Sequence, residues 1–356
     1  MPDTGTTCAH GDLEAFAHAL FAAAGMDADK AAVTARLLVL TDAMGRRTHG
    51  LAMAPMYLAE LARGGMKARG EPEVLRDNGL VALWDGRYLP GLWLVHRAMA
   101  IAMPRARERG LSAVAIRRSH HIGCLAVLVR EAAEAGLVAQ LWNSDPAGAR
   151  MAPYGGTEPL FTPDPFAMGY PGTPNPVLVD ISASITTTSM TRRKVAAGER
   201  FEHPWLLDAE GRPTDDPRVL EHTQPRGSLL PVGGTDHGHK GYGLALMNEA
   251  LSQGLAGHGR RDAPGRWGGN VYLQLTDTAH FAGLDAFTQQ TDHIAARARA
   301  SRPIDPARPV RVPGDQAARG IAEARAHGIH VDTATWQALR AEAERLRVPL
   351  PKEVSA

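Results

Sequence analysis

The sequence lacks the features that would place the protein in an oxidising compartment or in a membrane. Only two of its 356 residues are cysteines, Cys8 and Cys124, which excludes a disulfide framework and favours a reducing environment. It contains no run of 18 uninterrupted apolar residues, and the polar residues 1–12 do not resemble a signal peptide. The sequence therefore predicts a soluble, cytoplasmic protein without a membrane span.

Features typical of nucleic-acid-binding proteins are also scarce. Aromatic residues make up 5% of the chain, which leaves few rings for stacking on bases. Lysine and arginine total 39 against 38 aspartates and glutamates, so the formal net charge is only +1. A nearly neutral chain has no field that would attract a phosphate backbone. We expect a small-molecule partner and no nucleic acid.

Several common catalytic motifs are missing. No Gly-x-Gly-x-x-Gly follows an expected strand, which excludes the ordinary Rossmann fingerprint. No Gly-x-Ser-x-Gly elbow of a serine hydrolase occurs. Neither Cys-x-x-Cys nor His-Glu-x-x-His occurs, so we expect no bound metal. The segment 233–240 resembles a phosphate loop but lacks the Gly-Lys-Ser/Thr ending.

What is present is an alternation of helical and extended patterns in a chain long enough for about two domains. The pattern predicts helices near residues 13–24, 29–43, 55–63, 90–108, 125–135, 241–255, 283–299 and 332–346, and strands over 80–84, 111–116, 137–142, 177–181 and 271–275. The stretch 143–176 is rich in Gly, Pro and Asp and is predicted to be mostly a functional loop.

This order of elements predicts an α/β fold with two parts. The helical ends should pack together as one discontinuous domain, residues 1–75 with 283–356. They would flank a central α/β domain with a mixed sheet, residues 76–282, which would bind cofactor and substrate.

Thr48-His49-Gly50 is the first of four polar clusters. It lies in a loop just before a helix, where the positive end of the helix dipole disfavours a charged imidazole. A histidine that changes charge near the working pH suits general acid/base chemistry, and Thr48 could hold its tautomer. The alternative interpretation is a capping or surface histidine.

Two further clusters follow expected strands. The segment Ser119-His120-His121-Ile122-Gly123 lies between a strand and a helix, where α/β proteins bind ligands and backbone N–H groups hold phosphates. Asp180 ends another strand and is followed by Ser182 and Ser184; an acid there can accept hydrogen bonds from a ribose or an amide. A polar helix start and an ordinary turn are the alternatives.

The fourth cluster is the glycine-rich segment 233–243, which precedes an apolar helix. Its glycines favour close approach of the backbone to an anion, and a flexible linker is the alternative. His120 and His121 could also bind a metal together with His237 and His239, although no helical ligand spacing supports such a site.

Taken in order, these clusters resemble the second type of malate/L-lactate dehydrogenases. That family also contains ureidoglycolate and sulfolactate dehydrogenases, diketogulonate reductases and cyclic-imine carboxylate reductases. The matching segments, spread over about residues 12–350, are Thr48-His49-Gly50 with Tyr57, Ser119-x-His121-x-Gly123, Asn143, Tyr154-Gly155-Gly156-x-Glu158-Pro159-Leu160, Asp180-x-x-x-Ser184, Trp205-x-Leu207-Asp208, Gly211-x-Pro213-Thr214, His239-Lys240-Gly241-Tyr242-Gly243-Leu244 and Val312-Pro313-Gly314-Asp315. One such motif alone is weak evidence for the family, whereas the whole set in this order is specific to it.

The resemblance implies a non-Rossmann nicotinamide-binding fold, a homodimer, and NAD or NADP as cofactor. It makes His49 the proton donor/acceptor, with Thr48 in place of the family's usual serine. His121 has that role in some relatives, so either histidine is a candidate. Tyr57, Met53 and Ser184 match substrate-side positions. The positions that match cofactor contacts are His121, Ile122, Gly123, Cys124, Leu125, Asn143, Asp180, Ile181, Ser182, Lys240, Pro313, Gly314 and Asp315.

The chain departs from the family's pattern at three places. Met53 stands where relatives usually have an arginine that pairs with the substrate carboxylate, and methionine cannot replace that bidentate contact. Ser189-Met190 replaces a glycine followed by a charged residue, and Thr162-Pro163-Asp164-Pro165 replaces Gly-Thr-Asn-Pro. By resemblance these positions lie nearer the substrate than the cofactor.

The predicted function is an NAD(P)-dependent dehydrogenase/reductase acting on a carbonyl, imine or hydroxyl group of a small, non-standard substrate. Reducing a ketone or imine requires a hydride from nicotinamide and a proton from an acid of pKa near 7, which histidine supplies. Arg46, Arg47 or Arg150 could replace the charge lost at Met53. The alternatives are a catalytically altered member that acts as a binding protein or in a specialised biosynthetic pathway, and a metal-dependent hydrolase.

Overall fold

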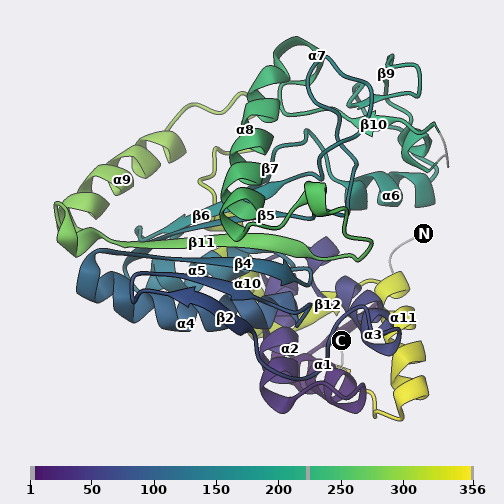
Figure 1. The fold of residues 1–356 in the computed structure, drawn as a ribbon, viewed down its shortest axis with the longest axis horizontal. Helices are drawn as coiled ribbons and strands as arrows, with labels where there is room; N and C mark the ends of the chain where they lie inside the picture. Colours follow the sequence, from purple (N-terminus) through teal and green to yellow (C-terminus); the bar gives the residue numbers. More distant parts are fainter. Residues whose placement is uncertain (1–4, 222–224, 354–356) are drawn as a thin grey trace.

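The computed structural model describes residues 5–221 and 225–353, with a seven-stranded sheet at its centre (Figure 1). The strands, in spatial order, are β2 (Glu73–Asp77), β3 (Val81–Asp85), β4 (Leu111–Ser119), β11 (Gly269–Asp277), β5 (Leu137–Ser144), β6 (Pro165–Tyr170) and β7 (Val177–Ser182). Strands β3 and β4 pair in parallel, and all other neighbours in this sheet pair antiparallel. The sheet is therefore mixed, unlike the parallel sheet of a Rossmann domain.

Helices cover both faces of this sheet (Figure 1). On one face α4 (Gly91–Arg109) packs on β4 and β11, and α5 (Leu125–Glu134) packs on β5, β6 and β7. The sequence of α4 explains its placement, because Leu92, Val95 and Met99 recur at helical spacing and are all buried. On the other face lies α8 (His239–Glu249), which continues as a π-helical turn at Ala250–Gly254.

The two ends of the chain meet beside the sheet. Strand β1 (Thr6–Cys8) pairs antiparallel with β12 (Ile329–Val331), and the rings of Phe16 and Trp336 lie 6.1 Å apart. The helices of this region are α1 (His10–Ala23), α2 (Ala28–Ala43), α3 (Ala54–Ala62), α10 (Asp315–His327) and α11 (Thr333–Leu346). Asp332 caps α11 by accepting the Thr335 N–H at 3.0 Å.

Helix α9 (Leu284–Arg299) lies apart from this helical region (Figure 1). Its Phe287 packs edge-on against Tyr170 of β6, with ring centroids 6.0 Å apart. Its Asp292 accepts the Thr173 N–H at 2.8 Å. The helix is thus attached to the middle of the chain, although the proposed helical domain includes it. The boundary at residue 283 stays a prediction.

A small lobe with its own apolar core extends from the α8 face of the sheet (Figure 1). It contains α6 (Thr188–Ala196), α7 (Gly234–His237), the turn η3 (Pro217–Leu220) and a sheet of β8 (Leu206–Leu207), β9 (Pro213–Thr214) and β10 (Ser228–Leu229). Its core is made by Met151, Phe161, Ala183, Phe201, Leu206, Leu229 and Ala245.

The predicted α/β class is confirmed, and all the predicted strands and helices appear within a few residues of their expected bounds. The interpretation of residues 143–176 as mostly loop is wrong for residues 165–170, which form β6 between β5 and β7. Pro165 and Gly169 are typical of turns and conceal this strand in the sequence. In the described part of the chain, no helix has both the length and the hydropathy needed to cross a bilayer.

Candidate active site

A buried carboxyl group shapes the loop that carries Thr48 and His49. Two short turns, η1 (Arg47–His49) and η2 (Leu51–Met53), join α2 to α3. Asp42 of α2 accepts the Leu51 N–H at 2.8 Å, and burial raises the pKa of Asp42 to about 7. A Cβ atom at Gly50 would collide with this carboxyl group. A larger residue at that position would displace the Asp42 carboxyl group, which holds the loop against α2.

The structure brings the two candidate histidines face to face. The rings of His49 and His121 are stacked, with centroids 6.1 Å apart and planes inclined by 19°. Thr48 Oγ1 lies 3.0 Å from His49 Nδ1, and the Tyr57 hydroxyl lies 2.7 Å from His121 Nδ1. Residues from two separate sequence clusters thus form one site.

Hydrogen bonds define the neutral tautomer of His121. The Gly123 N–H can only donate and lies 3.3 Å from His121 Nδ1, so this nitrogen is an acceptor. The Tyr57 hydroxyl then donates to the same nitrogen, which places the ring hydrogen on Nε2. Burial, reinforced by the neighbouring His49 and His120, lowers the pKa of His121 to about 3. His121 is therefore a neutral hydrogen-bond donor at neutral pH.

His49 has a different electrostatic environment. Burial lowers the pKa of His49, and Arg46 lowers it further, but the carboxylate of Asp180 opposes the shift. A nearby carboxylate stabilises an imidazolium, whereas the histidines around His121 destabilise one. Of the two rings, His49 is the better carrier of a proton.

A third histidine lies behind this pair. His120 is fully buried, and its Nε2 lies 3.4 Å from Oε2 of the buried Glu60. Burial lowers the pKa of His120 to about 4. Trp267 packs against the rings of His120 and His121, with centroid distances of 4.7 and 5.2 Å. The sequence interpretation missed Glu60 and Trp267, because a single glutamate in a helix and a single tryptophan in a loop carry no pattern.

A cavity of about 560 Å³ lies beside the His49 loop and is lined by several of the predicted cofactor positions. Asp180, Ile181, Pro313 and Gly314 line it. Asp180 Oδ2 accepts the Ala126 N–H at 2.9 Å and lies 3.4 Å from Cys124 Sγ, which ties the 121–125 segment to β7. The further lining residues are Met44, Gly45, Arg46, Ala126, Leu178, Val179, Arg311, Val312, Gln316 and Ala317.

The cavity is lined by side chains that can contact phosphate and ribose groups. Its arginines, Arg46 and Arg311, can neutralise phosphate charge, and Asp180 can accept hydrogen bonds from a ribose. Gly314 precedes α10 with φ 108°, and a Cβ atom there would collide with the Pro176 carbonyl. Glycine therefore lets the start of α10 pack closely against the backbone that precedes β7.

The remaining candidate residues have varied environments. Ile122, Cys124 and Leu125 are buried at the start of α5. Asn143 is buried on β5, and its Oδ1 has no hydrogen-bond partner in the described part of the chain. Lys240 is exposed in the first turn of α8 and makes no ion pair with another described residue. Asn143 and Lys240 therefore keep polar groups available for a ligand.

Other candidates are engaged within the protein. Ser182 Oγ donates to the Ser184 carbonyl at 2.9 Å, and Ser184 Oγ donates to the Thr186 carbonyl at 2.6 Å. Asp315 pairs with Arg299 at 2.7 Å. Met53 is 6% exposed and belongs to the main apolar core. The functional roles assigned to these residues stay predictions.

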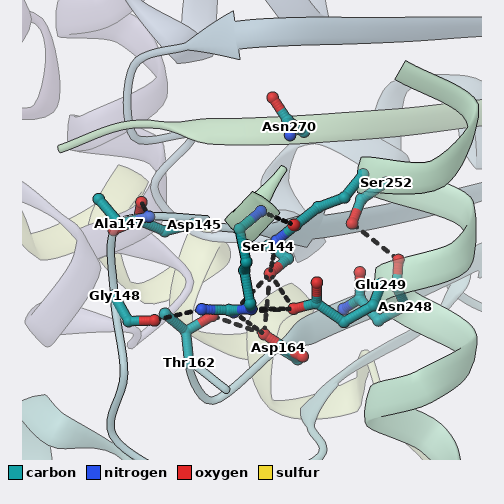
Figure 2. A network of polar contacts seen from close by, with 12 residues as sticks. Ser144, Asp145, Ala147, Gly148, Thr162, Asp164, Asn248, Glu249, Ser252 and Asn270 are labelled. Carbon is teal, nitrogen blue, oxygen red and sulfur yellow. Dashed lines mark hydrogen bonds and ion pairs between the residues drawn. The ribbon is translucent and has the colours of Figure 1, made fainter. Parts of the chain in front are cut away.

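A buried polar network lies at the end of β5, next to Asn143 (Figure 2). The Arg260 guanidinium donates to Glu249 Oε1 at 2.7 Å and to Ser144 Oγ at 3.2 Å. It also lies 3.9 Å from Asp164 Oδ1 and donates to the Gly148 carbonyl. Arg260 therefore contacts the carboxyl groups of Glu249 and Asp164, the end of β5 at Ser144, and the loop that follows β5 at Gly148.

Comparisons with known proteins show the family of the chain. The family model of malate/L-lactate dehydrogenases matches residues 8–340, and the chain belongs to this family. The (2R)-3-sulfolactate dehydrogenase (NADP(+)) of Chromohalobacter salexigens is 34% identical over 248 residues, 69% of this chain and 71% of that protein. Hydroxycarboxylate dehydrogenase B of Escherichia coli K12 is 29% identical over 353 residues, 95% and 93% of the two chains.

A solved structure shares the whole fold. The delta1-piperideine-2-carboxylate reductase of Pseudomonas syringae superposes with a TM-score of 0.83 at 26% identity, and the match covers 95% of this chain and 99% of that one. The resemblance inferred from the ordered motifs is confirmed, and the protein is an oxidoreductase by family. Among the described residues, no group of three or more His, Cys, Asp and Glu side chains could hold a metal ion.

Proposed function

We propose that the protein is an NAD(P)-dependent dehydrogenase/reductase of a small substrate, with His49 as the proton donor and acceptor. The observation that carries this proposal is the stacked His49–His121 pair beside the cavity that Asp180 lines. The bound nicotinamide supplies or takes the hydride. The protein's own residues bind the substrate, orient it and move the proton.

The two histidines have separate tasks in this proposal. In the direction of reduction, protonated His49 gives its proton to the substrate oxygen or nitrogen; in oxidation, neutral His49 removes that proton. Asp180 stabilises the imidazolium that forms on oxidation, and Thr48 fixes the ring. Neutral His121, held by Tyr57, offers its Nε2 hydrogen to the same substrate atom. In this proposal His49, and not His121, is the acid/base.

The first test is a fluorescence titration of the full chain with NADH and with NADPH. We expect saturable binding of at least one of them, and the comparison selects the cofactor. Arg311→Gln should weaken binding by about tenfold, because it removes a charged contact from the cavity. The matched control is Arg308→Gln, since Arg308 is highly exposed and is not a lining residue.

Absence of binding at millimolar concentrations of either cofactor would overturn the proposal. Cofactor binding without turnover on any carbonyl or imine substrate would instead support the alternative of a catalytically altered binding protein. In that case the chain would share the fold of its relatives but not their catalytic activity.

Two apolar helix surfaces support a homodimer as part of the proposal. Leu246 and Met247 of α8 are 48% and 52% exposed, and Ile294 of α9 is 67% exposed. Helix α9 buries only Ala295 fully among its 16 residues. Exposed apolar surface of this kind typically marks a protein–protein contact.

We expect light scattering at micromolar protein to give twice the chain mass of 38.0 kDa. Ile294→Glu should shift the mass towards one chain, because a charge would be buried without a partner at the contact. Ile304→Glu is the matched control, since Ile304 is fully exposed on a loop. A monomer mass for the unmodified protein would contradict the proposal.

We place the protein in the cytoplasm, where its two free cysteines stay reduced.

A further inference from the structure

His120 is a buried histidine to which the proposed reaction gives no task. Its side chain is fully buried, and neither ring nitrogen makes a hydrogen bond in the described part of the chain. Its Nε2 lies 3.4 Å from Oε2 of Glu60, within ion-pair range. A buried polar ring without a hydrogen bond costs stability. Stability alone therefore does not explain a histidine at this position.

The fold makes room for the Glu60 carboxylate. Glu60 is 3% exposed, and a Cβ atom at Gly65 would collide with its Oε2. The Glu60 carbonyl accepts the Met66 N–H at 3.0 Å, which turns the chain back over this carboxylate at the end of α3. Arg63 donates to Oε1 and balances the charge. One carboxylate oxygen is thus bound by Arg63, and the other faces His120.

The loop before β11 closes the other side of this arrangement. Trp267 packs against the rings of both histidines of the 119–123 segment, with centroid distances of 4.7 and 5.2 Å. The preceding residue, Arg266, donates to the Gly65 carbonyl at 3.1 Å and also to the Gly64 carbonyl. The loop that carries Trp267 is therefore tied to the end of α3, and it holds both histidine rings against that helix.

Helix α3 contacts the two adjacent histidines at two points. Tyr57 and Glu60 are three residues apart, so they lie on the same face of α3. The Tyr57 ring lies 5.9 Å from the ring of His120 and 5.9 Å from that of His121. Its hydroxyl lies 2.7 Å from His121 Nδ1, and these two residues are here called the donor pair. A shift of α3 that broke the Glu60–His120 contact would also move the donor pair apart.

We propose that Glu60 and His120 are positioning residues that hold the donor pair in its active arrangement. This inference rests on the proposed function, in which neutral His121 offers its Nε2 hydrogen to the substrate. A carboxylate can only accept hydrogen bonds, so the nitrogen of His120 that faces Glu60 carries the ring hydrogen. Their contact holds α3 against the 119–123 segment.

This contact controls the tautomer of His121. With α3 in place, the Tyr57 hydroxyl donates to His121 Nδ1, and the ring hydrogen stays on Nε2. When α3 shifts, Nδ1 loses its strongest donor, and the tautomer with the hydrogen on Nδ1 becomes populated. That tautomer has no hydrogen on Nε2 to offer to the substrate. Glu60 therefore acts on the reaction through His120 and the donor pair, without touching the substrate.

The tautomer of His121 provides a test that needs neither cofactor nor turnover. Nitrogen NMR of the full chain with isotope-labelled histidine separates protonated from unprotonated ring nitrogens, and the signal lost in His121→Asn identifies His121. We expect the hydrogen on Nε2 in the unmodified protein and a mixture of tautomers in Glu60→Leu. Glu60→Gln keeps an acceptor oxygen and should keep the unmodified spectrum. Glu108→Gln is the matched control, since Glu108 is 69% exposed on α4.

Steady-state kinetics then connect the contact to the reaction. Glu60→Leu should lower kcat by about tenfold, the usual effect of losing one hydrogen bond, and Glu60→Gln should recover most of it. Affinity for NADH and NADPH should stay unchanged. Adding Glu60→Leu to Tyr57→Phe should cause little further loss, because the hydroxyl through which Glu60 acts is already absent. If Glu60→Leu fails to fold, His120→Phe, which keeps a ring packed on Trp267, provides the same comparisons.

The outcomes separate this inference from the proposed function. An unchanged His121 tautomer in both Glu60→Leu and His120→Phe overturns it. Losses of Glu60→Leu and Tyr57→Phe that simply add also overturn it, because Glu60 would then act independently of the donor pair. A Glu60-dependent tautomer in a protein that binds neither NADH nor NADPH contradicts the proposed function and leaves the positioning role standing.

Discussion

His49→Asn is expected to lower kcat by about 100- to 10,000-fold in both reaction directions, the usual contribution of a positioned acid/base group. Asparagine keeps a polar side chain next to Thr48 but cannot carry a proton at any working pH. Cofactor affinity should change little, because His49 is not among the residues that line the 560 Å³ cavity. The measurement is steady-state kinetics together with the NADH and NADPH titrations.

The unmodified protein should show opposite pH dependence in the two directions. Reduction needs protonated His49, and the lowered pKa of His49 makes that form scarce at neutral pH. The rate of reduction should therefore rise as the pH falls towards and below the ordinary histidine pKa of about 6.5. Oxidation needs the neutral ring, so its rate should be flat above that pH. His49→Asn should abolish both dependences.

His121→Asn separates the two histidine roles. Asparagine is too short to place a donor where the His121 Nε2 hydrogen lies, and the substitution removes the ring nitrogen that accepts from Tyr57, so we expect a loss of activity with the pH profile retained. A pKa of about 3 keeps His121 neutral throughout the working range, so its titration cannot shape the profile. If the profile instead disappears in His121→Asn and survives in His49→Asn, the acid/base assignment must be reversed.

The two candidate histidines could be picked out from the sequence because they lie in short, distinctive loops, and the structure brings these loops together. Thr48-His49-Gly50 and the 119–123 segment each follow a regular element and contain histidine next to glycine. This pattern can be recognised without knowing how the helices and strands pack. Only the structure shows that the two rings lie 6.1 Å apart.

Positions that depend on packing could not be predicted. Asp42, Glu60 and Arg260 lie within or beside helices at places where charged residues are usually solvated. Only the tertiary fold shows that Asp42 holds the His49 loop and that Glu60 faces His120. Met53 is buried in the apolar core, as is Tyr57, so its burial does not decide the substrate-side position that the resemblance gives it.

Asp164 is the departure from the family pattern with the clearest structural consequence. It is fully buried beside Glu249, and burial and the Glu249 charge raise the pKa of Asp164 well above the usual value. The hydroxyls of Ser144 and Thr162 and the Arg260 guanidinium oppose the shift. A buried acid at this position therefore depends on the neighbouring arginine.

Arg260→Gln is expected to destabilise the fold by about 3–5 kcal/mol, the usual cost of removing one partner from a buried charge group. Glutamine keeps hydrogen-bonding capacity but leaves Asp164 and Glu249 without a counter-charge. The loop at Gly148 also loses its tether. The measurement is thermal and urea unfolding, with Arg261→Gln as control because the neighbouring Arg261 is exposed.

The deficit of Arg260→Gln should depend on pH in a defined direction. Without the guanidinium the folded-state pKa of Asp164 rises further, so the folded protein holds a proton that the unfolded chain releases above about pH 4. The free energy of unfolding of the variant then falls as the pH rises, and its deficit against the unmodified protein grows with pH between the two folded-state pKa values of Asp164. Asp164→Asn removes the titrating group and restores the residue usual in the family. Combined with Arg260→Gln, it should recover about 1–3 kcal/mol at the upper end of this pH range, since the two sites are coupled. If the losses of the two single variants simply add and the deficit is independent of pH, the role of Arg260 lies in tethering the Gly148 loop rather than in balancing the buried carboxyl groups.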